Sequence, residues 1–252
     1  MTNVLVCIKR VPDTGGEVEL TADGQGVDAR HVGFTISAHE SCAVELAVRI
    51  ATDTGGTATV LTVGTQDAVE QLRSALGVGC SAAVLVEADP TGYGPADIAR
   101  EIAAVAGAGD YDLVLLGNDA ADTGDFQVGI RLAYELGWPV VNGVSTVSVT
   151  GGEVTASGSG PDGYETFRLP LPAVVTVLEG GVEPRYPSVP GRMKAKKAPI
   201  EERQPTADPV GPSRVRLVLP PPSPSTVQVL GTGPEAAPAV VDLFEQLGVL
   251  AR

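Results

Sequence analysis

Apolar runs alternate with amphipathic segments along the first 140 residues of the chain. Four short apolar runs have the length and the Val and Leu content typical of buried strands: residues 4–8, 57–63, 82–87 and 112–117. Three intervening segments repeat apolar residues at three- and four-residue spacing, which predicts helices: residues 40–51, 66–77 and 95–107. Strands separated by helices indicate crossover units, so we predict a doubly wound α/β fold of the adenine-nucleotide-binding type with a mainly parallel sheet.

Two of the predicted helices carry end signals. Ser37 and Glu40 have the spacing of a capping box ahead of the first helix. Gly77 stands where a glycine is expected to end the second helix.

The pattern changes after Trp138. Two alternating segments flank Gly151 and Gly152, which predicts a β-hairpin, and residues 164–178 add further strands. These strands either extend the sheet in the antiparallel sense or form a small subdomain.

The chain beyond Pro199 is rich in Pro and Ser, so residues 200–252 are expected to form an extended C-terminal arm without a core of its own. Residues 1–199 are expected to form the nucleotide-binding α/β domain. A terminal amphipathic helix is predicted over residues 236–247, with its apolar stripe on Val240, Leu243, Phe244 and Leu247. The arm either folds back on its own domain or wraps a partner chain.

Composition argues against several classes of function. A net charge of -14 argues against nucleic-acid binding and against anionic membrane surfaces. The three cysteines have no CxxC spacing, and with only two histidines no metal-ligand cluster is recognisable. The apolar run at residues 4–8 is too short for a signal peptide or a membrane span, so we expect a cytoplasmic protein without direct membrane insertion.

Positive charge gathers in one stretch of this acidic chain. Three of its four lysines are Lys194, Lys196 and Lys197, and Pro184, Pro187 and Pro190 precede them. The cluster is either a docking device or a solvated cationic turn at the end of a helix.

Ligands of open parallel sheets gather outside the carboxyl ends of the strands. The loop after the fourth predicted strand contains Gly117, Gly124 and Gly129, and a helix is expected to begin near Asp125, where exposed N–H groups attract phosphate. Asp119, Asp122 and Asp125 are candidates to accept hydrogen bonds from ribose or to cap that helix. The spacing matches neither GxGxxG nor a Walker loop, so nucleotide binding and a purely structural turn both stay open.

Catalytic patterns are scarce. The sequence has no GxSxG elbow and no histidine with an evident nucleophile partner. Cys7 lies within an apolar strand, which favours an inert, buried thiol over a reactive one. The residues therefore indicate a nucleotide-holding domain without chemistry of its own.

Five segments, in this order, carry a resemblance to a known family: "VLVCIKRVPD", "AVELAVR", "LRSALGVGCSAAVLV", "DLVLLGNDAADTGDFQVG" and "LPAVVTVLEGGVEPRYPSVPGRMKAKK". Together they resemble the beta subunit of electron-transfer flavoproteins, from Val4 to about Pro199. The combination of "EPRY" and "MKAKK" is the most specific part, whereas the C-terminal arm is similar only in character.

This resemblance implies an electron carrier subunit, not an enzyme. It implies a heterodimer with an alpha subunit that holds most of an FAD, and single electrons that pass from acyl-CoA or other flavin dehydrogenases to a quinone oxidoreductase. The beta subunit of the family typically buries an AMP, and in a bifurcating branch a second FAD replaces it. We favour AMP here and keep the second FAD as the alternative.

The resemblance also implies a cofactor pocket on particular residues of this chain. Two of them depart from the AMP-binding pattern, because His39 replaces an aromatic residue near the flavin and Val128 offers no hydroxyl group. The pocket residues are Cys7, Ser37, Ala38, His39, Glu40, Val63, Gly117, Asn118, Asp119, Ala120, Ala121, Asp122, Thr123, Gly124, Asp125, Phe126, Gln127 and Val128.

The family's recognition loop corresponds to residues 183–197. In the family this loop inserts an aliphatic side chain into a pocket of the dehydrogenase, and Val189 stands at that position. The lysines are expected to steer acidic partner surfaces. The partner-binding residues implied are Arg185, Tyr186, Val189, Arg192, Met193, Lys194 and Lys197.

Two other classes of protein compete with this interpretation. One is a stand-alone adenine-nucleotide sensor of the stress-protein type. The other is a small nucleotidyl transferase, which is disfavoured because the loop from Gly117 to Gly129 has no basic residue to neutralise a developing phosphate charge.

Overall fold

The computed structural model describes residues 1–13, 15, 18–30, 32–211, 214–221 and 227–249. The chain divides into two compact units, Met1–Leu217 and Val218–Arg252. Among the described residues, the first unit contains every β-strand and five α-helices, and the second contains one α-helix.

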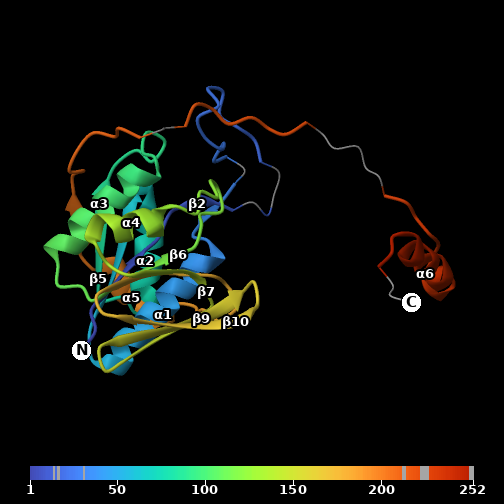
Figure 1. The fold of residues 1–252 in the computed structure, drawn as a ribbon. Coiled ribbons are helices and arrows are strands. Elements are labelled where there is room, and N and C mark those ends of the chain that lie inside the picture. Colours follow the sequence, from blue (N-terminus) through green and yellow to red (C-terminus); the bar gives the residue numbers. More distant parts are fainter. Residues whose placement is uncertain (14, 16–17, 31, 212–213, 222–226, 250–252) are drawn as a thin grey trace. The chain divides into compact units, whose positions relative to one another are not determined.

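A seven-stranded sheet forms the centre of the first unit (Figure 1). Its strands are β1 (Val4–Cys7), β4 (Ala58–Gly64), β5 (Ala82–Glu87), β6 (Leu113–Gly117), β7 (Val140–Val144), β11 (Ala173–Val177) and β12 (Glu201–Arg203). They lie in the order β12-β5-β4-β1-β6-β11-β7, and every neighbouring pair is parallel. The predicted parallel α/β fold is therefore confirmed.

Helices cover both faces of this sheet, because its central strands bury both of their sides. Val4, Val6 and Ile8 belong to one apolar cluster with α1 (Ala38–Thr54) and α2 (Val69–Val78). Leu5 and Cys7 belong to a second cluster with α3 (Pro95–Ala108) and α4 (Val128–Leu136). A short 3-10 turn, η1 (Gln66–Ala68), leads into α2. The continuous apolar runs of the sequence are thus explained by strands buried on two sides.

The predicted capping box of α1 is confirmed. Ser37 Oγ accepts from the backbone N–H of Glu40 at 3.2 Å, and the Glu40 carboxylate accepts from the backbone N–H of Ser37 at 3.0 Å. The expected end of α2 at Gly77 is wrong, because the helix continues to Val78 and Gly79 follows it at a φ of 145°. The positive φ at Gly79 ends the helix, whereas Gly77 is a close-packing position.

The predicted hairpin belongs to a separate antiparallel sheet. Its strands are β8 (Thr146–Thr150), β9 (Glu153–Gly160) and β10 (Gly163–Pro170). Gly151 and Gly152 form the turn with φ values of 62° and 83°. Val147, Val154 and Ala156 face the apolar cluster that contains α1. Meanwhile β7 and β11 join the central sheet in the parallel sense, so only part of this region is antiparallel.

A small excursion separates β1 from α1. It contains the antiparallel pair β2 (Val11–Pro12) and β3 (Phe34–Thr35). The Arg10 guanidinium lies 3.4 Å from the centroid of the Phe34 ring, a cation–π contact that ties the two ends of the excursion together.

Residues 200–217 lie with the first unit, although the sequence assigned them to the arm. Strand β12 pairs with β5, and two buried carboxylates of α3 hold the chain that follows. Glu101 accepts from the backbone N–H of Thr206 at 2.7 Å, and Asp97 accepts from those of Val210 and Gly211 at 3.0 and 2.9 Å. The first compact unit ends at Leu217, whereas the sequence predicted a domain that ends at residue 199. Local composition does not reveal these long-range hydrogen bonds.

The second unit contains η2 (Gly233–Ala236) and α6 (Ala237–Gln246). The helix predicted over residues 236–247 is confirmed to within one residue at each end. Within the described part of the chain α6 has no buried residue, and Phe244 and Leu247 are exposed.

Candidate functional site

A crevice is expected at the carboxyl ends of β1 and β6, because the chain builds β4 and β5 on one side of β1 before it crosses to β6 on the other. Three strands bring predicted cofactor residues to this edge: β1 ends at Cys7, Val63 lies at the end of β4, and β6 ends at Gly117. The start of α1 brings residues 37–40 to the same edge. The fold therefore assembles these parts of the predicted pocket.

Gly117 lets α1 approach the sheet edge closely. A Cβ atom at this position would lie 2.8 Å from Glu40 Cγ and 3.2 Å from His39 Cβ. Such contacts are too short for an ordinary side chain, so only glycine permits this arrangement.

Glu40 is a buried acid at the start of α1, with 6% of its surface exposed. Burial raises the pKa of its carboxyl group to about 8, although hydrogen bonds from Ser37 and the backbone and charge of Lys9 act in the opposite direction. Glu40 therefore holds a proton to a higher pH than an exposed glutamate does. Burial, with a smaller contribution from Glu40, also raises the pKa of the Cys7 thiol, which agrees with an inert cysteine.

Two charged contacts join the loop after β6 to the rest of the crevice. Lys9 Nζ lies 2.7 Å from Asp122 Oδ1 and 3.4 Å from Thr123 Oγ1. His39 Nδ1 lies 2.7 Å from Asp119 Oδ1, but the two are not aligned as a hydrogen bond. This nitrogen is buried against the Asp119 carboxylate and makes no aligned hydrogen bond among the described residues.

Asn118 is fixed by the neighbouring strands. Its side-chain oxygen accepts from Thr176 Oγ1 at 2.7 Å, and the same hydroxyl accepts from the backbone N–H of Gly143 at 2.9 Å. This network joins the ends of β6, β7 and β11, so the loop leaves the sheet in a defined direction.

Helix α4 begins at Val128, so the expectation that it starts near Asp125 is wrong. Gly124 and Phe126 have φ values of 58° and 55°, which keep the chain out of the right-handed helical region until Gln127. No side chain caps α4, so the three aspartates of the loop do not cap it as one alternative proposed. Its first N–H groups lack side-chain acceptors and lie at the positive end of the helix dipole.

The remaining predicted pocket residues lie in the same loop, except Val128, which is the first residue of α4. Most are partly or fully exposed: Ala120, Ala121, Thr123, Asp125, Phe126 and Gln127.

These groups suit a phosphate-containing ligand. Lys9 supplies a cation that is paired with Asp122, and the uncapped start of α4 supplies backbone N–H groups. The raised pKa of Glu40 weakens the negative charge near these groups. Lys9 and the start of α4 are therefore the candidate contacts for such a ligand.

The sequence interpretation missed Lys9 and Thr176. Lys9 lies outside residues 117–129, in the loop that leaves β1. Only folding brings it to the same sheet edge as Asp122. Thr176 is buried within β11, and no local pattern distinguishes it from its strand neighbours.

The second group of predicted residues lies on and before α5 (Val189–Lys197). The stretch that the sequence treated as a loop is therefore helical in its second half, with Ser188 Oγ accepting from the N–H of Gly191 at 3.1 Å as its N-cap. Val189, Met193 and the preceding Tyr186 are exposed. The predicted cations Arg192, Lys194 and Lys197 are also exposed.

Arg185 has a different environment from the other predicted partner-binding residues. Its guanidinium group contacts the buried carboxylate of Glu45, with Nε and Nη2 each 2.7 Å from an oxygen. It is half exposed.

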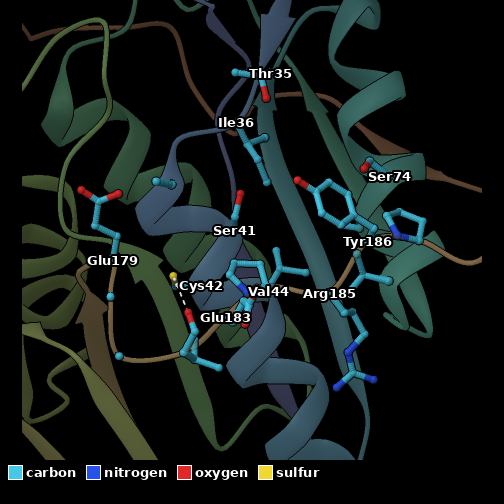
Figure 2. A pocket seen from close by; sticks show the side chains of 18 residues that line it. Thr35, Ile36, Ser41, Cys42, Val44, Ser74, Glu179, Glu183, Arg185 and Tyr186 are labelled. Carbon is cyan, nitrogen blue, oxygen red and sulfur yellow. Dashed lines mark hydrogen bonds between the residues drawn. The ribbon is translucent and has the colours of Figure 1, made fainter.

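A groove of about 740 Å³ lies between α1, α2 and residues 179–187 (Figure 2). Ser41, Cys42 and Val44 line it from α1, and Tyr186 lines it from the opposite chain segment. The Cys42 thiol donates to the carbonyl of Val182 across the floor of the groove at 3.4 Å. Sequence reasoning did not predict this groove.

Among the described residues, no group of three or more His, Cys, Asp or Glu side chains is placed to hold a metal ion. No helix in the described ranges has both the length and the apolar character needed to cross a membrane.

Comparison with known proteins adds a family relationship to this geometry. The family model for the electron transfer flavoprotein domain matches residues 26–208. The chain is 34% identical over 205 residues to the electron transfer flavoprotein subunit beta of Bacillus subtilis, which covers 79% of this chain and 78% of that protein. It is 36% identical over 203 residues to the protein of the same name from Bradyrhizobium diazoefficiens, with 79% and 80% covered. The alignment with the electron transfer flavoprotein subunit beta of Megasphaera elsdenii has 30% identity over 257 residues and covers 95% of each chain.

Proposed function

Because the chain belongs to the family of electron transfer flavoprotein beta subunits, we propose that it pairs with an alpha subunit and helps to hold the FAD through which electrons pass. In this proposal the FAD is shared with the alpha subunit, and the crevice at the end of β1 and β6 holds an AMP. When bound, the FAD supplies the electron chemistry, while the residues of this chain bind, orient and dock.

The convergence of β1, β6, the start of α1 and the loop after β6 is the observation that supports nucleotide binding. Gly117 allows the start of α1 to lie against the sheet edge, and the loop that follows reaches an uncapped helix start. Lys9 places a cation beside the loop, where it pairs with Asp122. A phosphate could then be met by backbone N–H groups and one lysine.

The chemistry of the groups at the crevice supports a carrier role without substrate-level catalysis. Cys7 is the potential nucleophile at the end of β1, and burial keeps its thiol protonated. His39 faces the carboxylate of Asp119, which is no nucleophile–base pair. We therefore assign these groups to binding.

The exposed face of α5 supports docking to a dehydrogenase. Val189, at 74% exposure, is an apolar side chain on a helix whose last turn carries three lysines. An apolar anchor bordered by charge suits a short-lived contact in which steering raises the association rate. The electron donors in this proposal are acyl-CoA or other flavin dehydrogenases, and the acceptor is a quinone oxidoreductase.

Cofactor analysis of the heterodimer tests the proposal. The chain is co-expressed with the alpha subunit, and the denatured complex is analysed by absorbance and mass spectrometry. We expect one FAD and one AMP per heterodimer. Recovery of two FAD molecules per heterodimer would show that a second FAD takes the place of AMP. Recovery of no nucleotide besides one FAD would contradict nucleotide binding by this chain.

Membership of this family argues against the stand-alone nucleotide sensor that the sequence left open. Such a sensor requires a stable monomer that binds ATP and has no affinity for an alpha subunit. Size-exclusion chromatography of the co-expressed proteins separates the two possibilities.

A further inference from the structure

Residues 185–197, here called the docking segment, lie on α1 and α2 and form no part of the sheet. From the contacts described below, we propose that Glu45 of α1 and Gly77 of α2 are positioning residues, which hold the docking segment in one conformation before a partner arrives. The inference rests on the proposed docking function and adds two residues that lie outside the exposed contact surface.

Glu45 fixes the beginning of the docking segment. It lies in the middle of α1 with 1% of its surface exposed, and both of its oxygens face arginines. Arg185 donates to it from its backbone N–H at 3.3 Å and from Nε and Nη2 at 2.7 Å each. Arg49, one turn along α1, donates from its own Nε. Bidentate contact and a backbone bond together fix the direction in which the chain leaves Arg185.

The Glu45 carboxyl group is ionised at neutral pH. Burial alone would raise the pKa of this carboxyl group, but the hydrogen bonds from Arg185 and Arg49 outweigh burial and hold the pKa at about 2. Because the pKa is lowered, the carboxylate keeps the charge that its contact with Arg185 requires at neutral pH.

Gly77 allows the middle of the docking segment to lie directly on α2. A Cβ atom on Gly77 would lie 3.0 Å from Pro187 Cβ, and one on Gly191 would lie 2.5 Å from the carbonyl oxygen of Gly77. Two backbones thus meet without intervening side chains. A glycine inside a helix is otherwise unfavourable, which indicates that Gly77 serves this contact.

Arg73 fixes the end of the docking segment. Its Nη1 donates to the carbonyl of Ala195 at 2.6 Å and to that of Ala198 at 3.3 Å. Both carbonyls lie at the C-terminal end of α5, where Ala195 also accepts from the backbone N–H of the C-cap residue Ala198 at 3.2 Å. The docking segment is consequently held at its beginning, its middle and its end.

The exposed side chains follow from this arrangement. Tyr186 and Val189, at 92% and 74% exposure, project from a backbone that three contacts hold in place. Figure 2 shows Arg185 and the Tyr186 ring leaving the chain in different directions at the edge of the groove. A segment that is already ordered loses less conformational entropy on binding, which favours a tighter complex with the same contacts.

The first experiment replaces Glu45 and leaves the exposed contact surface unchanged. In the heterodimer, Glu45→Gln is compared with Glu135→Gln, which removes the same charge from an exposed position on α4, outside residues 183–197. Hydrogen exchange of residues 185–197 is measured by mass spectrometry. Reduction of the bound flavin is followed by stopped flow, with an acyl-CoA dehydrogenase of the same organism reduced by its acyl-CoA.

For Glu45→Gln we expect faster hydrogen exchange in the docking segment and about a tenfold higher half-saturating dehydrogenase concentration. The limiting rate of flavin reduction and the flavin spectrum should not change, because the cofactor geometry is untouched. Glu135→Gln should leave all four quantities unchanged. Unchanged exchange in Glu45→Gln would overturn the proposal, as would faster exchange with unchanged half-saturation.

The second variant tests the glycine contact without altering charge. Gly77→Ala improves the intrinsic helix propensity of α2 but forces Pro187 away, whereas Gly107→Ala makes the same change near the end of α3, where no atom lies within 4 Å. We expect only Gly77→Ala to raise the half-saturating concentration. Equal behaviour of the two alanine variants would contradict a positioning role for Gly77.

Val189→Ala separates failure of this inference from failure of the proposed function. If Val189 contacts the dehydrogenase, its truncation should raise the dissociation rate by about five- to thirty-fold with normal exchange in the docking segment. If it has no effect, docking through this segment is wrong, whatever Glu45 does. If it has the expected effect while Glu45→Gln and Gly77→Ala do not, docking stands and the positioning inference is overturned.

Discussion

Glu40 shows how burial can outweigh several favourable contacts at a single residue. The carboxyl group receives hydrogen bonds from Ser37 and lies near Lys9, yet its pKa is raised to about 8 because water is excluded. The folded state therefore binds a proton more tightly than the unfolded state does. For such a group, the stabilising contribution is complete below the unfolded pKa and is lost as the pH rises toward 8.

Glu40→Gln should remove this dependence on pH. We expect the free energy of unfolding of the wild-type chain to fall between about pH 5 and pH 8 by up to a few kcal/mol, since each unit between the two pKa values corresponds to about 1.4 kcal/mol. The Glu40→Gln variant should show a flatter profile, which urea unfolding at several pH values will measure. Glu135→Gln, at an exposed position of α4, is the control and should retain the wild-type slope. A wild-type profile that is already flat over this range would contradict the raised pKa.

Other residues show what could be read from the sequence at this scale. The Ser37 and Glu40 capping box could be predicted because both partners lie within one helical turn. The role of Gly77 could not, because its contact is with Pro187, which is distant along the chain. The role of Lys9 could not be predicted either, because its partner Asp122 lies on another loop.

Helix α5 concentrates its charge at one end. Lys194, Lys196 and Lys197 lie in its last turn, where they also face the negative end of the helix dipole. All three are exposed, so their action on a partner is electrostatic and is screened by salt over about 8–10 Å.

Neutralising these three lysines to Gln should slow association with the dehydrogenase and flatten its dependence on ionic strength. Stopped-flow reduction of the heterodimer across a salt series measures both effects. A matched variant replaces Arg30, Arg131 and Arg168, three exposed cations elsewhere, by Gln and makes the same change in net charge. Full salt dependence in the lysine variant would make the cluster a solvated helix end, and an equal effect in the arginine variant would show that only net charge matters.

Strands and helices of the first 140 residues could be predicted because their apolar patterns are local. The start of α4 could not be predicted, because the positive φ values of Gly124 and Phe126 delay the helix. The partition of residues 140–177 between two sheets was also left open. β7 and β11 join the parallel sheet through pairing with distant strands, which a local pattern does not specify.

At the scale of the whole molecule, the second unit has an apolar stripe without a core. Within the described part of α6 no residue is buried, and Phe244 and Leu247 are exposed. A helix of this length gains little stability by itself, so its apolar stripe requires a surface to pack against. We propose that this surface belongs to the alpha subunit.

Deleting residues 227–252 should therefore weaken the heterodimer more than it lowers the melting temperature of the isolated chain. Analytical ultracentrifugation measures the first quantity, and thermal unfolding measures the second. Replacing only Phe244 and Leu247 by Ser should reproduce most of the loss if the stripe makes the contact. Equal affinity for the alpha subunit after deletion would show that the arm has another role.

The sequence by itself determined the parallel α/β fold, the hairpin and the terminal helix. These follow from hydrophobic periodicity and from glycine positions, both of which act over a few residues. Tertiary structure decided which groups meet: Lys9 with Asp122, Glu45 with Arg185, and Asp97 and Glu101 with residues 206–211. Such pairs join residues distant along the chain, and only the packing of helices on the sheet brings their charges within bonding distance.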